Sequence, residues 1–198
     1  MEIRAALDEP HRTDKFFPLA FYSDILRDLT SSELQSPFQD PGSEDAMPQR
    51  LSGGCQCGAL RYQLGRLPKR SCICHCRMCQ KASGQPFMAF VTFDENDLRW
   101  TRGAPAIFKS SSLAERGYCR NCGTPLFFKF EGQEISVTTG SLDDPSAAPP
   151  TVQYGAESEI PWCGTLHTLP RIRTEEDFGP ELVVRFRSYQ HPDHDTIE

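Results

Sequence analysis

Cysteines at short spacings are the residues of this chain best suited to chemistry. Eight of the nine cysteines fall into three groups, which are Cys55 and Cys57 in GGCQCG, Cys72 to Cys79 in CICHCRMCQ, and Cys119 and Cys122 in CRNCG. Thiolates at such spacings bind zinc and other soft metal ions. Residues 1–15 carry acids and lack the basic-then-apolar pattern of a secretory signal. We therefore expect a cytoplasmic protein that uses its cysteines for metal binding or thiol chemistry and not for disulfides.

The first and third groups predict one closed metal site. Cys119 and Cys122 are separated by two residues and followed by Gly123, which is the pattern of a zinc knuckle. The glycine permits the tight turn that exposes backbone N–H groups to sulfur. A knuckle supplies half of a tetrahedral site, and Cys55 and Cys57, flanked by glycines, are its natural complement. The alternatives are buried free cysteines and disulfides.

The middle group has a different pattern. Cys74, Cys76 and Cys79 form C-x-C-x-x-C, and three protein ligands with a fourth position left for water or substrate are typical of a reactive zinc site. Cys72 shares strand parity with Cys74 and Cys76, so a second closed four-cysteine site is an alternative, as is a thiol cluster without metal. His75 points the other way on an extended segment. We interpret it as a substrate-side or a structural histidine.

Basic residues surround the middle group. Between residues 51 and 93 the sequence contains no Asp or Glu, and its cations are Arg61, Arg66, Lys69, Arg70, Arg77 and Lys81. Cations offset the negative charge of a thiolate-rich zinc site and attract an anionic ligand. The alternative is that these side chains are solvated and have no role.

The segments that must position the cysteines have strand character. Short aromatic or β-branched runs, bounded by turn residues, occupy residues 59–64, 87–93, 106–110, 125–130, 134–140 and 182–187. Turn signals between neighbouring runs favour antiparallel hairpins. The sequence predicts a mainly β fold of small antiparallel sheets, in which metal must help to hold the core.

Charge and composition divide the chain into three parts. Residues 1–50 are net −5 and form an acidic N-terminal extension and linker, residues 51–170 are net +2 and form the zinc-binding domain, and residues 171–198 are net −3 and form a C-terminal strand and frayed tail. In the extension, residues 16–29 place apolar side chains on one helical face, which could cap the domain or join copies of the chain into a homo-oligomer. The alternative is that this segment is disordered. The net charge of −6 argues against nucleic-acid binding, and no apolar run is long enough to span a membrane.

The motifs and their order resemble the glutathione-dependent formaldehyde-activating enzyme family, whose domain is shared with centromere protein V. The matching segments are Gly53 to Gly58, Cys74 to Cys79 with Ser83-Gly84, Tyr118 to Leu126, Thr139 to Pro145, and Pro161-Trp162. The resemblance covers about residues 51–170. It implies a β-tent fold with a structural zinc on Cys55, Cys57, Cys119 and Cys122 and a second zinc on Cys74, Cys76 and Cys79.

The family's founding activity is the condensation of formaldehyde with glutathione to S-hydroxymethylglutathione, which is a carbon–sulfur lyase reaction run backwards. The resemblance therefore implies a lyase with Cys74, Cys76 and Cys79 at the catalytic zinc and a small thiol such as glutathione as substrate. One position departs from the family pattern, because Gln153 stands where members commonly have a histidine. A glutamine cannot act as a general base. The alternative function is a non-catalytic zinc module that binds other proteins.

Overall fold

The structure is a computed structural model that describes residues 51–65, 68–132 and 134–196. The predicted N-terminal extension, including the helical face at residues 16–29 and the oligomer contact expected of it, lies outside the described residues. No helix among the described residues is long and apolar enough to cross a membrane.

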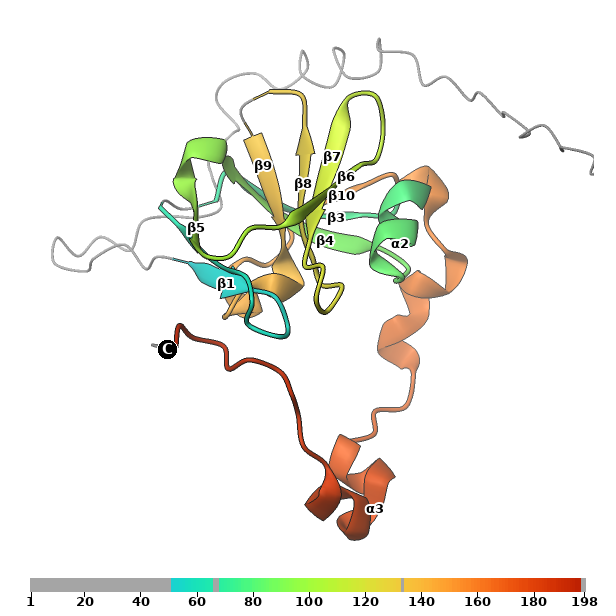
Figure 1. The fold of residues 1–198 in the computed structure, drawn as a ribbon. Coiled ribbons are helices and arrows are strands. Elements are labelled where there is room, and N and C mark those ends of the chain that lie inside the picture. The colour runs from blue at the N-terminus through green and yellow to red at the C-terminus, as the bar shows by residue number, and fades with distance from the viewer. Residues whose placement is uncertain (1–50, 66–67, 133, 197–198) are drawn as a thin grey trace, which may run out of the picture. The chain divides into compact units, whose positions relative to one another are not determined.

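The described chain is built around two β-sheets (Figure 1), which confirms the prediction of a mainly β fold. The smaller sheet has the order β1-β2-β5, with β1 at Ser52–Gly54, β2 at Arg61–Leu64 and β5 at Leu98–Arg102. The larger has the order β10-β3-β4-β9-β8-β7-β6, with β3 at Arg70–Cys74, β4 at Met88–Asp94, β6 at Ala106–Lys109, β7 at Ala114–Tyr118, β8 at Pro125–Phe130, β9 at Glu134–Thr138 and β10 at Val152–Tyr154. Among the described strands only β10 and β3 pair in parallel. The expectation of antiparallel hairpins missed that pair, because strand β10 arrives from far along the chain.

The main core lies between the two sheets. Tyr62 and Leu64 of β2 pack in one cluster with Val91 and Phe93 of β4 and Val137 of β9. Strand side chains alternate between the two faces of a sheet. Strand β4 therefore also supports a second cluster on its other face, formed by Met88 and Phe90 with Cys72 and Cys79. The alternation along one strand connects the core to the middle cysteine group.

Helices are short. Among the described residues the α-helices are α2 at Arg77–Ser83 and α3 at Thr174–Arg185, and the 3-10 helices are η1 at Glu95–Asp97, η2 at Thr139–Ser141, η3 at Pro145–Ala147, η4 at Ala156–Ser158 and η5 at Pro161–Thr168. Helix α2 begins directly after Cys76, so the extended geometry assumed for the middle group ends at Cys74. Gly84, in the left-handed conformation at φ 68°, ends the helix.

The prediction of a C-terminal strand at residues 182–187 is wrong. Leu182 to Arg185 belong to α3, which is interrupted at Gly179. Acidic residues fill the first turn and Arg185 the last, which complements the helix dipole. The described part of the following tail is held against the domain and is not frayed, because the main-chain N–H of His191 donates to the main-chain oxygen of Gln56 at 2.7 Å and Asp195 pairs with Arg61 at 3.0 Å.

Candidate metal centres

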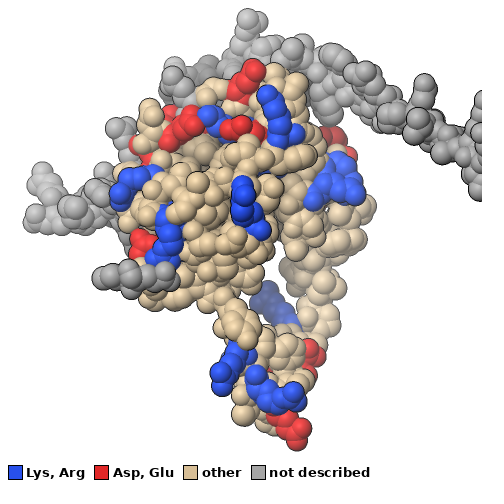
Figure 2. Space-filling model, viewed as in Figure 1, with Lys and Arg blue, Asp and Glu red and all other residues tan. Residues whose placement is uncertain are grey.

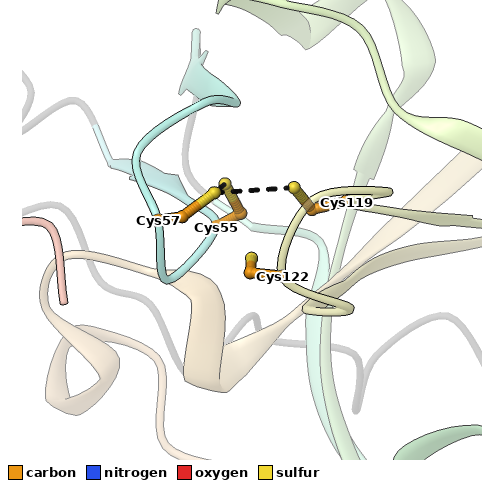
Figure 3. Close-up of side chains that lie close together, drawn as sticks. All are labelled: Cys55, Cys57, Cys119 and Cys122. Carbon is orange, nitrogen blue, oxygen red and sulfur yellow. Dashed lines mark hydrogen bonds between the residues drawn. The ribbon is translucent and has the colours of Figure 1, made fainter. Parts of the chain in front are cut away.

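Four sulfurs from two distant loops meet at one point (Figure 3). Cys55 and Cys57 come from the loop after β1, and Cys119 and Cys122 from the loop between β7 and β8. All four Sγ atoms lie within 4.8 Å of one another, with 3.5 Å between Cys55 and Cys57 and 3.8 Å between Cys57 and Cys119. The structure thus brings together the four cysteines that the sequence predicted as one site.

Each loop is a tight turn closed by its own backbone. The N–H of Gly58 donates to the oxygen of Cys55 at 3.0 Å, and the N–H of Gly123 donates to the oxygen of Cys119 at 2.8 Å. Both glycines have positive φ, at 75° and 79°, which glycine adopts without the steric cost of a Cβ. The two loops are joined by a hydrogen bond of 3.1 Å from the Gln56 N–H to the Thr124 hydroxyl.

The thiols of this cluster differ in how readily they ionise. Burial raises the pKa of Cys55 to about 12. Burial also opposes ionisation of Cys122, but hydrogen bonds from Thr124 outweigh it and lower the pKa of Cys122 to about 6. An acidic Cys122 in one group with a protonated Cys55 is an arrangement that a divalent cation would complete by displacing the remaining proton.

The donor set fits a tetrahedral zinc ion. A Zn–S distance of about 2.3 Å places tetrahedral sulfurs about 3.8 Å apart. The sulfur separations of 3.5 and 3.8 Å agree with that spacing. Cys55 and Cys119 are also part of the main core, so an ion held here would tie two loops and the core together.

The second cluster joins Cys74, Cys76 and Cys79. Their sulfurs also lie within 4.8 Å of one another. Cys74 ends β3, Cys76 caps α2, and Cys79 lies in the first turns of that helix. Cys72 is buried on β3 and does not belong to the group. The geometry therefore favours the three-cysteine site over the closed four-cysteine alternative.

Hydrogen bonds concentrate negative charge on the central sulfur of this cluster. Those from the Cys74 and Cys79 thiols, with help from backbone N–H groups of α2, hold the pKa of Cys76 far below its usual range. The hydrogen bonds of Cys74 with Cys76 and Cys79 raise the pKa of Cys74. The three sulfurs, one thiolate and two thiols, could hold a divalent metal and leave one coordination position for another ligand.

Arg116 of β7 adds a cation that the sequence analysis missed. Its Nη2 donates to the Cys79 sulfur at 3.4 Å and its Nη1 to the Met88 sulfur at 3.7 Å. The guanidinium stacks on Phe128, 4.8 Å from the ring centre. Arg116 lies three residues before Cys119 of the other cluster, and nothing in the local pattern indicates that it reaches Cys79.

Most of the described basic residues between 51 and 93 have acidic partners. Arg61 pairs with Asp143 through both terminal nitrogens, at 2.8 and 2.6 Å. Lys69 pairs with Asp94 at 2.6 Å, and Arg70 with Glu134 at 2.8 Å. Arg66 is not described. Only Arg77 and Lys81, both on α2, remain among the described residues to support the predicted basic flank.

These two cations line a cavity of about 570 Å³ beside the second cluster. Arg116 lines it as well, and Figure 2 shows Lys and Arg side chains over α2. Its other walls are mainly apolar or aromatic and are formed by Met78, Ala82, Met88, Phe108, Ser110, Gly117, Tyr118, Gly123, Pro125 and Phe127. The cysteines do not line the cavity, but Arg116 and Met88 connect it to the Cys79 sulfur.

His75 lies inside the protein beside this cluster. It is 2% exposed, and its Nε2 is 2.8 Å from Oε1 of Gln153 on β10. Its Nδ1 has no hydrogen-bond partner in the described part of the chain. Gln153 therefore fixes the orientation of the His75 ring, and as an amide it cannot act as a general base. Gly155 follows at φ 65° and packs against the Cys76 backbone.

The sequence that carries both cysteine clusters matches a known protein family. The family model of the glutathione-dependent formaldehyde-activating enzyme matches residues 50–158, more than half of the chain. The chain belongs to this family. Both cysteine clusters lie within the matched residues.

Two known proteins are similar to parts of the chain. An uncharacterised lyase of Schizosaccharomyces pombe is 38% identical over 85 residues, which is 42% of this chain and 60% of that protein. A solved protein of Rhodobacter sphaeroides is 22% identical, with a TM-score of 0.44, and the alignment covers 52% of this chain and 98% of that one.

Proposed function

We propose that this protein is a zinc-dependent carbon–sulfur lyase or synthase. Its substrate would be the adduct of a small thiol with an aldehyde, with S-hydroxymethylglutathione as the first candidate. The observation that carries the proposal is the cluster of Cys74, Cys76 and Cys79, which has three sulfurs, no fourth among the described residues, and a cavity beside it. Membership in the formaldehyde-activating family and the lyase name of the fission yeast relative support it.

The reaction balances without a further reactant. In the cleavage direction the C–S bond breaks and its electron pair leaves with sulfur as a thiolate. The hydroxyl oxygen becomes the carbonyl oxygen and gives its proton to water. Zinc held by Cys74, Cys76 and Cys79 would supply a Lewis acid for the sulfur or the oxygen.

The chain's own residues would bind and orient the adduct. Arg116 keeps a fixed positive charge against Cys79, and Arg77 and Lys81 attract an anionic ligand to the cavity. Gln153 cannot accept a proton near neutral pH, so its task is to fix the His75 ring. Cys55, Cys57, Cys119 and Cys122 would hold a second zinc whose function is structural.

The test compares two neighbouring cysteines. Cys76→Ser removes a member of the cluster, whereas Cys72→Ser changes a buried cysteine that is not part of it. Formation of S-hydroxymethylglutathione from ¹³C-formaldehyde and glutathione is followed by exchange NMR. The proposal predicts acceleration by the wild type and by Cys72→Ser, and none by Cys76→Ser in a folded protein. Equal rates for wild type and Cys76→Ser would favour the non-catalytic zinc module.

The organisation around this domain is part of the same proposal. Residues 51–170 would form the catalytic domain, residues 1–50 would cap it or join copies of the chain, and a reducing, cytoplasmic setting would keep the thiols free. Removing residues 1–48 and measuring the mass in solution tests the role of the extension. An unchanged number of chains per assembly would exclude an oligomer contact there.

A further inference from the structure

The cavity beside α2 collects positive charge without a counter-charge. Arg77, Lys81 and Arg116 line it, and no Asp or Glu is among its described lining residues. We infer that this cavity binds a small organic carboxylate that carries an apolar segment, and that Arg116 recognises the carboxylate. The inference rests on the proposed function, since it names the chemical class of ligand taken by the same site.

The surroundings of Arg116 carry the argument. Arg116 is 8% exposed, and a buried guanidinium needs hydrogen-bond partners for its donors to offset its lost hydration. Its described contacts are two sulfurs, at 3.4 and 3.7 Å, and the face of Phe128. A guanidinium has five N–H donors, and sulfur accepts weakly. Arg116 therefore retains donor capacity at the edge of the cavity, and a carboxylate is the group that suits it best.

The walls define the rest of the ligand. Met88 and Phe127 are buried, whereas Met78 and Phe108 are exposed. These side chains offer an apolar lining to any group attached to the carboxylate. A cavity of about 570 Å³ is in the range that holds a small metabolite or a tripeptide.

The same lining selects against a positively charged group. An ammonium group placed here would meet Arg77, Lys81 and Arg116 and no described carboxylate. Like charges in a partly dry site repel one another. Glutathione fits this class through its carboxylates, and its ammonium group would have to stay in water. A thiol acid without an ammonium group would fit better.

Three sulfur-free probes of one shape test the inference apart from any turnover. They are 3-phenylpropanoate, 3-phenylpropanamide and 3-phenylpropylamine, titrated into the full zinc-loaded chain and followed by ¹H–¹⁵N NMR. We expect the acid to bind about tenfold more tightly than the amide, as for one charge-assisted hydrogen bond, and the amine most weakly. Equal binding of acid and amide, tighter binding of the amine, or no saturable shift with the acid would each overturn the inference.

Matched variants assign the effect to Arg116. Arg116→Gln should abolish the preference for the acid, whereas Arg99→Gln, which removes an exposed charge on β5, should leave it unchanged. If both variants lower the preference equally, net charge and not Arg116 is responsible. If Arg116→Gln does not fold, the exposed pair Arg77→Gln and Lys81→Gln decides, because it should weaken acid binding several-fold and leave amide binding alone.

The two proposals can fail separately. Binding of the acid without any acceleration of a thiol–aldehyde reaction would leave the carboxylate site and remove the lyase. Acceleration of the reaction without preferential binding of the acid would support the lyase and overturn the carboxylate site.

Discussion

Nε2 of His75 lies 2.8 Å from Oε1 of Gln153. An amide oxygen only accepts hydrogen bonds, so the ring proton of a neutral His75 must sit on Nε2. The His75 backbone is held as well, since its N–H donates to the oxygen of Tyr154 at 2.8 Å and its oxygen accepts from Gln80 at 2.7 Å. His75, which lies between Cys74 and Cys76, is therefore held by hydrogen bonds to its ring and to its backbone.

This arrangement predicts the tautomer of His75. The ¹⁵N shifts of its neutral ring should show a protonated Nε2 and an unprotonated Nδ1. Gln153→Leu should remove the preference and destabilise the fold by about 1 kcal/mol, the usual contribution of one hydrogen bond. A proton on Nδ1 in the wild type would contradict the assignment of Gln153 as acceptor.

Gly155 should be required at the second cluster for steric reasons. Its φ is 65°, and a Cβ there would lie 2.7 Å from the Cys76 nitrogen. Gly155→Ala should therefore displace Cys76 and weaken metal binding at that cluster by about tenfold or more, equivalent to about 1.4 kcal/mol. Competition with a chromogenic chelator measures the affinity.

Gly179→Ala is the matched control for that variant. Gly179 has φ 68°, but a Cβ added there would have no described atom within 4 Å outside its own chain neighbours. Both variants incur the strain of a positive φ, and only Gly155→Ala creates the clash. Equal effects on metal affinity would mean that the contact with Cys76 does not matter.

The ion pair between Arg61 and Asp143 should contribute stability that depends on pH. Burial opposes ionisation of Asp143, but hydrogen bonds from Arg61 and Ser52 outweigh it and lower its pKa. Because the folded pKa is depressed, the contribution is complete above the unfolded value of about 3.9 and is lost as pH falls through the folded value. Asp143→Asn should cost about 3 kcal/mol at pH 7, because it leaves Arg61 buried and only partly paired.

Urea unfolding of wild type and Asp143→Asn at a series of pH values checks the sign. The difference in unfolding free energy should be constant at neutral pH and shrink only below about pH 4. Using the difference cancels the loss of metal in acid, which affects both proteins. A difference that grows as pH falls would refute the depressed pKa.

The C-terminal tail should stabilise the loop that carries Cys55 and Cys57. The His191 ring lies against Gly58, and Arg102 donates to the Thr196 oxygen at 2.7 Å. Deleting residues 188–198 should lower the free energy of unfolding by about 1 to 2 kcal/mol and speed zinc loss to a chelator from the four-cysteine cluster. An unchanged rate of zinc loss would show that the tail does not protect this loop.

Local patterns were sufficient to predict much of this protein. The turn geometry of Cys119-x-x-Cys122-Gly123 and its complement at Cys55 and Cys57 follow from short spacings, and the structure brings those sulfurs together. The strand of residues 87–93 also follows from composition alone, and β4 occupies Met88–Asp94. Each of these features depends on residues close together in sequence.

The features that were missed depend on contacts between distant segments. Arg116 reaches Cys79 across 37 positions, and the parallel pairing of β10 with β3 brings Gln153 to His75 across 78. Residues 182–187 have the composition of a strand, but Leu182 to Arg185 fold as helix behind Pro180 with an acidic first turn. No local rule ranks such partners, because the energy that selects them comes from packing of the whole domain.

The central claim is that the cluster of Cys74, Cys76 and Cys79 binds a reactive metal ion, whereas the four-cysteine cluster binds a metal ion that stabilises the fold. Zinc per chain, measured by elemental analysis of protein purified without chelator, tests it most directly when Cys79→Ser and Cys119→Ser are measured beside the wild type. We expect two ions in the wild type and one in a folded Cys79→Ser, whereas Cys119→Ser should lose its cooperative thermal transition. One ion in the wild type that Cys79→Ser retains, or unfolding of both variants alike, would contradict the account.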